Sequence, residues 1–369
     1  MKFSVVQVID TLEAGGAERV AVNIANWLAQ NGHRSYLCVT RRGGPLETEI
    51  DSRVQVIRLN RRGRFDGKAV IRFARFIFRE KIDIIHAHST SLFLAIIAVK
   101  IALRGKLIWH DHYGAFGVNA RSVLLYRCAI QFARAVIVVN HELEKWARNE
   151  LEVSPHRIHY MQNFFVQPPM PSLNMFLPGE IGKRVLLVGN LRPQKDHPNF
   201  LKSIKLVLQE EPEAQFFIVG GYNDKNYFAA LQSMANELEI TNNVHWLGQR
   251  NDVRDLLRHF EIGVLSSASE GFPLTLLEYG DAGLAVVATN TGQCAEILDG
   301  GQAGILVPPG DAPELAAGIL RLLRDRSLRG KLGDRLKQFV DENYHIDVVI
   351  PRLVRIYSEI LCQDSTVRQ

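Results

Sequence analysis

Short runs of apolar and β-branched residues recur along the whole chain, and stretches with helical periodicity separate them. Examples are FSVVQVI, IDIIHAH and KLIWH in the first half, and RVLLVG, EIGVLSS and LAVVAT in the second. These runs are mainly continuous rather than alternating in apolar character, as in strands that are buried on both faces. The sequence therefore predicts an α/β protein with doubly wound parallel sheets.

Two series of such strands are separated by a proline-rich stretch, NFFVQPPMPSLNMFLPGEIGK, which lacks helical periodicity. A chain of 369 residues is also long for a single hydrophobic core. We therefore expect two Rossmann-like domains facing a cleft, at residues 1–165 and 183–344, with a linker at 166–182. The stretch VVIPRLVRIYSEIL predicts an amphipathic terminal helix at about 345–369. Ligands are expected at the carboxyl ends of the strands.

Charge is distributed unevenly, with 24 Lys and Arg against 14 Asp and Glu in residues 1–170, and 20 against 25 in the remainder. The basic half predicts an anionic partner. The four cysteines are scattered, without a CxxC pair, which is typical of reduced cytosolic thiols. The longest apolar run, LFLAIIAVKIAL, is interrupted by Lys100 and is shorter than the ~20 residues that cross a bilayer. We expect a cytoplasmic protein with at most peripheral contact to the cytoplasmic face of the inner membrane.

Two glutamates bracket the apolar segment EGFPLTLLE. Proline is favoured at the first position of a helix, so Pro273 predicts that Glu270 lies in a loop and Glu278 nearly two turns into a helix. The first-turn N–H groups around Leu274, Thr275 and Leu276 then lack intrahelical acceptors and could bind a phosphate. Beside cations, Glu278 would stay ionised and accept hydrogen bonds from ribose hydroxyls. The alternative is that Glu278 is simply a solvent-facing helix residue.

Two further loops follow strands. In DTLEAGGAERV, the pair Gly15 and Gly16 lets the backbone approach a ligand before a helix begins at Ala17, although a tight turn explains it equally well. In VGNLRPQKDHPNF, Arg192 and Lys195 could clamp a diphosphate. The alternative for this loop is a solvated basic turn.

Together with HWLGQRNDV and NTGQCAEIL, these segments resemble the retaining glycosyltransferases of family four with the GT-B fold, over essentially the whole chain. The resemblance implies that a sugar is moved from a nucleotide-sugar, UDP being favoured over GDP, by a metal-independent, same-face route without a cofactor. It further implies a lipid-linked or saccharide acceptor, as in surface polysaccharide or lipopolysaccharide biosynthesis. In this fold the terminal helix crosses back onto the first domain.

The resemblance also implies roles for individual residues. Glu270 would lie against the transferred sugar and Glu278 would hold the ribose. Lys195 and Arg192 would bind the diphosphate, and the loop of Gly15 and Gly16 would touch the phosphate or the sugar. Many members have Gly-Arg where this chain has Gly189-Asn190, so the assignment of Arg192 is a hypothesis. The remaining donor-site candidates are Leu247, Gly248 and Arg250 beside the base, and Phe272, Pro273, Leu274 and Thr275 around the helix start.

Histidines follow two strands of the first half, in IIHAHS and IWHDHYG. Residues two apart in a strand point to the same side, so His86, His88, His110 and His112 could bind a metal and support a metal-dependent hydrolase. The resemblance offers another account, in which His110, Asp111 or His112 contacts the acceptor hydroxyl or the sugar. The sequence leaves open which of the three does so.

The segment RRGRFDGKAVIRFARFIFREK predicts a helix with one basic stripe and one apolar face. The stripe could bind anionic lipid or a diphosphate-linked acceptor, or it could be merely solvated. Nucleic acid is not expected, because no stacking platform accompanies the charge. A non-catalytic sugar-nucleotide or membrane-binding protein is the other alternative. The basic residues are Arg61, Arg62, Arg64, Lys68, Arg72, Arg75 and Arg79, and the apolar face contains Val70, Phe73, Ala74 and Ile77.

Overall fold

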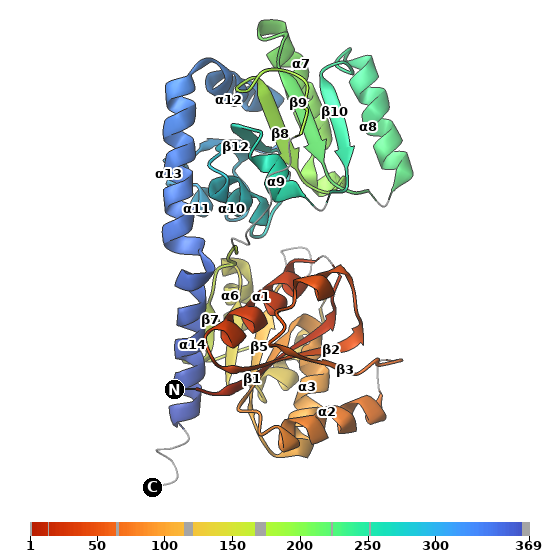
Figure 1. The fold of residues 1–369 in the computed structure, drawn as a ribbon, viewed down its shortest axis with the longest axis vertical. Helices are drawn as coiled ribbons and strands as arrows, with labels where there is room; N and C mark the ends of the chain where they lie inside the picture. Colours follow the sequence, from red (N-terminus) through yellow and green to blue (C-terminus); the bar gives the residue numbers. More distant parts are fainter. Residues whose placement is uncertain are drawn as a thin grey trace. The chain divides into compact units, whose positions relative to one another are not determined.

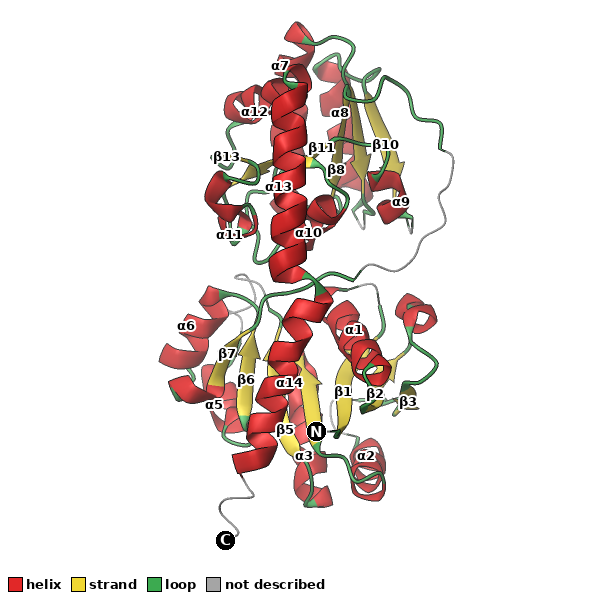
Figure 2. Ribbon diagram, turned by 60° about the vertical axis from the view of Figure 1, so that its left-hand side comes forward, coloured by secondary structure: helices red, strands yellow, loops and turns green. Residues whose placement is uncertain are grey.

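The computed structural model describes residues 2–13, 15–63, 66–113, 121–166, 175–222, 224–250 and 252–363. Internal contacts divide the chain into two compact units. Unit 1 comprises Met1–Phe164 and Ile346–Gln369, and unit 2 comprises Phe165–His345. Each unit is a parallel sheet with helices on both faces, which confirms the predicted α/β class (Figures 1 and 2).

The sheet of unit 1 has seven strands in the order β3-β2-β1-β4-β5-β6-β7, and all described pairs are parallel. Strand order reverses between β1 and β4, so the loops after these strands flank the topological switch point where ligands bind in such sheets. The strands are β1 Ser4–Thr11, β2 Arg34–Arg42, β3 Gln55–Arg58, β4 Ile84–His88, β5 Lys106–Asp111, β6 Ala135–Val138 and β7 Ile158–Tyr160.

Helices α1 and α14 cover one face of this sheet, and α2, α3, α5 and α6 cover the other (Figures 1 and 2). Helix α14 belongs to unit 1, and its Tyr357 is fully buried, so the terminal helix does return to the first domain as expected. The bounds are α1 Gly16–Gln30, α2 Gly67–Arg79, α3 Leu92–Ala102, α5 Val123–Ile130, α6 His141–Asn149 and α14 Ile346–Gln363, with short 3₁₀ helices η1 Pro45–Glu49, η2 Ser89–Ser91 and η3 Pro155–Arg157.

The sheet of unit 2 has six strands in the order β10-β9-β8-β11-β12-β13, and its order reverses between β8 and β11. Helices α7, α8 and α12 pack on one face and α9, α10, α11 and α13 on the other (Figure 1). The strands are β8 Arg184–Val188, β9 Gln215–Val219, β10 Val244–Gly248, β11 Ile262–Leu265, β12 Ala285–Thr289 and β13 Ile305–Val307. The helices are α7 His197–Glu210, α8 Lys225–Glu237, α9 Val253–Leu257, α10 Leu274–Asp281, α11 Cys294–Ile297, α12 Ala312–Arg324 and α13 Arg326–Tyr344, with η4 Pro193–Lys195 and η5 Asp299–Gly301.

Side-chain caps set where several helices begin. Asp66 accepts a hydrogen bond from the N–H of Ala69 at the start of α2, and Asn140 does the same for Leu143 in α6. Such caps satisfy N–H groups that have no intrahelical acceptor. No helix in the described ranges is both long enough and apolar enough to span a bilayer.

Candidate active site

The switch point of unit 2 brings together two of the predicted residues. Lys195 ends η4, in the connection that follows β8, and Glu270 lies in the loop after β11. Because β8 and β11 are neighbours in the sheet, both loops leave the same edge. Lys195 Nζ lies 2.5 Å from Glu270 Oε1, and their side chains are 18% and 10% exposed. The structure thus forms a shielded ion pair at the edge where a ligand is expected.

Two serines that the sequence analysis did not select hold this pair. Ser267 Oγ donates to Glu270 Oε1 at 2.6 Å, and Ser266 Oγ donates to the carbonyl of Lys195 at 2.9 Å. The sequence SSASE could have indicated these serines, because polar residues directly after a buried strand commonly line a ligand site. Gly292 contributes from a third loop. A Cβ at this position, where φ is +53°, would lie 2.3 Å from the carbonyl oxygen of Glu270.

Helix α10 begins beside this pair. Pro273 is its N-cap rather than its first residue, which corrects the predicted start. The N–H of Leu276 donates to the Pro273 carbonyl at 3.1 Å. The prediction that this N–H is free to bind a ligand is therefore wrong. The N–H groups of Leu274 and Thr275 donate to no acceptor in the described part of the chain. Two backbone donors therefore remain at a helix start, where an anion is favoured.

Tyr279 fixes α10 to the sheet. Its hydroxyl accepts a hydrogen bond from the N–H of Val188 at 2.8 Å and lies 3.1 Å from the Val264 carbonyl, to which it can donate. Burial raises the pKa of this phenol, which keeps it neutral. Glu278 precedes it on α10 and is partly exposed, unlike the buried Leu277.

The other donor-site candidates lie farther along the same edge. Arg192 is exposed, forms no ion pair among the described residues, and lines a cavity of about 240 Å³ together with Tyr222 and Gln249. Arg250 is held by Asp252, with Nη2 2.5 Å from Oδ2. The remaining candidates are Gly248, which ends β10 with φ of +64°, Leu247, which is partly buried, and Phe272, whose ring centroid is 5.7 Å from that of Tyr344.

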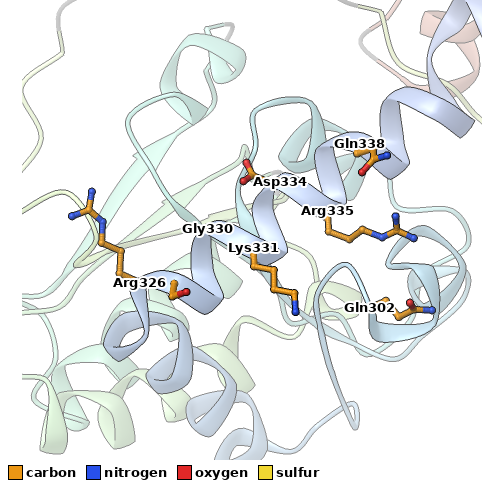
Figure 3. Close-up of a pocket in the computed structure, with 8 residues that line it drawn as sticks. Gln302, Arg326, Gly330, Lys331, Asp334, Arg335 and Gln338 are labelled. Carbon is orange, nitrogen blue, oxygen red and sulfur yellow. The ribbon is translucent and has the colours of Figure 1, made fainter.

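A larger groove of about 1260 Å³ runs along α13 (Figure 3). It is lined by side chains such as Lys331, Asp334 and Arg335, and Arg335 is ion-paired with Asp299. None of the predicted site residues lines this groove. Its charges have both signs, and its size alone does not make it a site.

In unit 1, α1 begins at Gly16, one residue earlier than predicted, and Gly15 is its N-cap. A Cβ on Gly15 would lie 2.3 Å from Oε2 of Glu18. The other oxygen of Glu18 accepts from the Thr11 hydroxyl at 3.1 Å. Glycine at position 15 thus lets Glu18 fold back over the loop. Among the residues that the structure describes, no side chain caps α1.

Asp111 forms a buried ion pair with Arg121. Its Oδ2 lies 2.7 Å from Arg121 Nη1, and the two side chains are 1% and 7% exposed. The guanidinium of Arg121 also lies 4.0 Å from the ring centroid of Trp146 and 4.5 Å from that of Tyr113. Burial raises the pKa of Asp111, and Arg121 opposes this shift. The carboxylate is therefore part of a buried ion pair.

The histidines form one layer on the α14 face of the sheet. Nitrogen atoms of His86, His88 and His110 lie within 4.8 Å of one another. However, His86 Nδ1 is 2.6 Å from the Tyr357 hydroxyl, and both nitrogens of His88 have hydrogen-bond partners. The rings of His86 and His110 are also nearly parallel, at 9°, so their in-plane lone pairs do not converge as a tetrahedral metal site requires. These residues fit a metal ion poorly.

The basic stripe on α2 is only partly as predicted. Arg61 is not a surface residue, because its side chain is 8% exposed and lies 3.1 Å from Asp10. Arg72 donates to the Leu59 carbonyl, and Arg79 is paired with Glu80 at 3.0 Å. Within the described part of the chain, the exposed members without such contacts are Arg62, Lys68 and Arg75. Arg64 lies outside the described residues. The predicted apolar face of Val70, Phe73, Ala74 and Ile77 is buried.

Comparisons with known proteins give the same class for both units. The family model described as Glycosyltransferase Family 4 matches residues 14–165, and that described as Glycosyl transferases group 1 matches residues 178–339. The chain therefore belongs to the glycosyltransferases of family four, and it is an enzyme of the hexosyltransferase type. The metal-dependent hydrolase considered as an alternative has no support here.

Two relatives and one solved structure illustrate the likeness. The chain is 24% identical to an N-acetyl-alpha-D-glucosaminyl L-malate synthase from Bacillus anthracis, over 82% of this chain and 81% of the relative. It is 25% identical to a UDP-Gal:alpha-D-GlcNAc-diphosphoundecaprenol alpha-1,3-galactosyltransferase from Escherichia coli, over 89% of each. The structure of Anabaena Alr3699/HepE in complex with UDP superposes with a TM-score of 0.78 at 19% identity, covering 96% of this chain and all of that one (100%). This likeness confirms the two-sheet GT-B fold.

Proposed function

We propose that this enzyme is a retaining transferase that moves a sugar from a UDP-sugar to a lipid-linked or saccharide acceptor during synthesis of a surface glycan. The names of the relatives support the proposal, since one uses UDP-Gal and a diphosphoundecaprenol-linked acceptor. The UDP complex of the Anabaena protein supports UDP as the nucleotide of the donor. Such an acceptor would place the enzyme at the cytoplasmic face of the membrane.

The ion pair of Lys195 and Glu270 beside the open start of α10 carries this proposal. When the bond between the anomeric carbon and the diphosphate breaks, negative charge develops on the leaving phosphate. Lys195 and the N–H groups of Leu274 and Thr275 are fixed donors for that charge, and fixed donors need no reorganisation during the reaction. The acceptor hydroxyl forms the new bond on the same face and gives its proton to the departing phosphate oxygen. In this mechanism the fixed cation neutralises the charge that a metal ion neutralises in other transferases.

Isothermal titration calorimetry with UDP, GDP and their sugars tests the donor. We expect Lys195→Met to weaken UDP binding about 10- to 100-fold, because a charged hydrogen bond contributes ~1.5–3 kcal/mol. Lys205→Met is the matched control, since Lys205 forms a lysine–glutamate pair of 3.1 Å elsewhere on unit 2. Tighter binding of GDP than of UDP, or equal affinity in Lys195→Met and the control, contradicts the proposal.

We further propose that an anionic bilayer contacts the outer surface of α2, α3 and α5. The three helices cover the same face of the unit 1 sheet, and none of them contains Asp or Glu. Exposed cations lie among exposed apolar side chains, and Lys100 Nζ is 3.7 Å from the ring centroid of Phe132. An apolar surface with basic neighbours suits the interface of an anionic membrane. The exposed apolar residues on or just after these helices are Ile71, Phe78, Ile97, Ile101, Leu103, Leu124, Leu125 and Phe132.

Sedimentation with phosphatidylglycerol vesicles tests this surface. We expect Phe78→Glu combined with Leu124→Glu to lower vesicle binding more than tenfold. Each change removes apolar area that the bilayer would bury and adds a negative charge that the anionic lipid repels. Ile181→Glu in unit 2 is the control, since Ile181 and Leu124 are both 72% exposed. An equal loss in the control, or unchanged binding of the double variant, rules out this surface.

A further inference from the structure

Three connections of unit 1 lead from its covering helices back into the sheet, joining α2 to β4, α3 to β5 and α5 to β6. Strands β4, β5 and β6 are parallel neighbours. Because neighbouring parallel strands begin at the same edge of a sheet, the three connections lie side by side at the amino edge. The ligands of doubly wound sheets bind at the opposite, carboxyl edge. The amino edge is therefore available for another function.

Each of these connections exposes a large apolar side chain beside a cation. Phe78 is the penultimate residue of α2, Leu103 directly follows α3, and Phe132 lies two residues beyond α5, and all three are exposed. An exposed arginine follows each apolar residue by one or two positions. We call this surface the amino-edge patch, and its members are Phe78, Leu103 and Phe132 with Arg79, Arg104 and Arg134.

Contacts between the connections join the patch into one surface. Lys100, in the last turn of α3, places Nζ 3.7 Å from the ring centroid of Phe132. Nη2 of Arg104 donates to the Lys81 carbonyl at 3.4 Å. The end of α3 and its connection thus contact both of the other connections.

The acidic side chains within the three connections, Glu80 and Asp83, are partly buried. Oδ2 of Asp83 accepts hydrogen bonds from the N–H and the hydroxyl of Ser4 in β1, both at 2.9 Å. Arg79 and Arg104 pair with these two acids, but their own side chains stay 77% and 41% exposed. The charge that the patch presents to its surroundings is therefore positive.

Leu103 adopts a backbone conformation that does not suit leucine. It is the C-cap of α3, with φ of +50° and ψ of +28° in the left-handed region. Glycine or asparagine usually occupies such a position, because a Cβ atom crowds the backbone there. The side chain is 91% exposed, so packing within the described part of the unit does not compensate. Leucine is thus unfavourable here in water, and a partner outside the unit would account for it.

We propose that the amino-edge patch is the part of unit 1 that enters an anionic bilayer most deeply, with its apolar side chains among the acyl chains and its arginines at the lipid phosphates. The inference rests on the proposed bilayer contact of α2, α3 and α5, and it adds the end of that face at which the protein is anchored. A guanidinium binds phosphate through paired hydrogen bonds, and its long stem keeps the charge at the surface while neighbouring side chains insert. The boundary between headgroups and acyl chains favours this pairing.

Leu103→Asn tests the anchor without endangering the fold. Asparagine suits the left-handed region, so the melting temperature should stay the same or rise. Binding to phosphatidylglycerol vesicles, measured by sedimentation, should fall about tenfold, because a polar side chain replaces an inserted leucine. Leu124→Asn is the matched control and should weaken binding less than threefold, since Leu124 is exposed in the first turn of α5, at the other end of the helix face. A loss in Leu103→Asn no greater than that in the control overturns the inference.

The fluorescence of a nitrobenzoxadiazole label reports the depth of insertion directly. The label is attached to Leu103→Cys or to Leu124→Cys, in a protein whose exposed Cys128 and Cys362 are replaced by serine. On addition of vesicles, the emission maximum should shift to shorter wavelength by more than twice as much at position 103 as at position 124. An equal or smaller shift at position 103 contradicts deeper insertion of the amino edge.

The arginines are tested by Arg79→Gln combined with Arg134→Gln. Each basic residue near an anionic leaflet strengthens binding severalfold, so this double variant should bind phosphatidylglycerol vesicles more than tenfold less tightly. Its weaker binding to phosphatidylcholine vesicles should not change. Arg62→Gln combined with Lys68→Gln is the charge-matched control, since these exposed residues lie just before and at the start of α2, toward the carboxyl edge. Equal losses in the two double variants overturn the role of the patch arginines.

The outcomes separate this inference from the proposals on which it rests. Equal effects at the two ends of the helix face, with binding still lost in Phe78→Glu combined with Leu124→Glu, overturn the anchor and leave the bilayer surface standing. If the unsubstituted enzyme does not bind phosphatidylglycerol vesicles, the surface and the anchor both fail. Self-association in lipid-free buffer that Leu103→Asn abolishes, seen by analytical ultracentrifugation, assigns the patch to a second copy of the chain and overturns the inference. UDP affinity should be unchanged in Leu103→Asn, so these results leave the donor function standing.

Discussion

The carboxylate of Glu270 is held through one oxygen. Lys195 and Ser267 both donate to Oε1, while Oε2 has no hydrogen-bond partner among the described residues. A carboxylate fixed on one side presents its other oxygen in a defined direction. This geometry suits a group that contacts the transferred sugar, as the family resemblance implies.

Ser267→Ala tests that geometry. The substitution removes one of the two donors, and a hydrogen bond to a charged group contributes ~1.5–3 kcal/mol, so we expect kcat to fall about tenfold or more. The UDP dissociation constant, measured by calorimetry, should change less than threefold. Ser203→Ala is the control, because Ser203 is buried in the same unit and donates to the Phe200 carbonyl within α7. Equal kcat values for the two variants contradict this role for Ser267.

The sequence could predict some of these residues but not their partners. Lys195 and Glu270 were expected at the same edge because each follows a buried strand. Whether Asp111 is free or paired depends on Arg121, which lies ten residues later in the sequence. Side-chain pairing of this kind depends on tertiary packing and leaves no periodic signal in the sequence.

At the scale of elements, α14 is attached to the unit 1 sheet by both polar and apolar contacts. The hydroxyl of Tyr357 lies 2.6 Å from His86 Nδ1, and both side chains are fully buried. Near the start of the helix, Trp27 donates to Asp347 at 2.7 Å. The hydroxyl of Tyr357 and Nδ1 of His86 are thus hydrogen-bond partners between two buried side chains.

Tyr357→Phe should therefore destabilise unit 1. Removing the hydroxyl leaves a ring nitrogen of His86 buried and unsatisfied, which costs about 1–3 kcal/mol. Denaturant unfolding followed by circular dichroism measures the change in the free energy of unfolding. Tyr222→Phe is the control, since that side chain is 43% exposed. A change below 0.5 kcal/mol would mean that the hydrogen bond contributes little.

Most strands could be predicted as elements because they are buried on both faces and so read as continuous apolar runs. Strands β7 and β13 were missed. Each is a three-residue edge strand, and β7 is only partly buried. A short strand that pairs on one side needs no long apolar run, so composition does not distinguish it from a loop. The start of α10 was misplaced by one residue for a similar reason, since a proline suits the N-cap as well as the first turn.

At the scale of the whole molecule, each unit has one switch point, and Lys195 and Glu270 lie at that of unit 2. Strand order reverses between β1 and β4 and between β8 and β11. The sequence predicted parallel sheets and hence the edge that carries the site. It could not predict strand order, which determines that Lys195 and Glu270 become neighbours.

The layer of buried histidines makes acid stability a property of all of unit 1. Burial lowers the pKa of His86 and His112 to about 3, and those of His88 and His110 well below the usual 6.5. Below pH 6.5 the unfolded chain therefore binds protons that the folded chain does not. The contribution of these histidines to the free energy of unfolding is therefore fully present above pH 6.5. It should decrease as the pH falls toward 3.

Guanidinium unfolding at pH 7, 6 and 5, followed by tryptophan fluorescence, to which the buried Trp109 and Trp146 of unit 1 contribute, measures this dependence. His110→Gln should reduce the slope by the contribution of one proton, since glutamine does not titrate in this range. A free energy of unfolding that stays constant from pH 7 to pH 5 would show that these imidazoles titrate alike in the folded and unfolded states.

Unit 1 is built from two distant parts of the chain, and this affects how it forms during translation. His86 and Tyr357 are separated by 271 residues, which a ribosome adding ~5–20 residues per second needs roughly 14–54 s to synthesise. Throughout that interval α14 has not been synthesised and cannot cover its face of the sheet. The imidazoles at the centre of this sheet face are polar and can form hydrogen bonds with water. The face is therefore less apolar than an ordinary hydrophobic core until α14 has been synthesised.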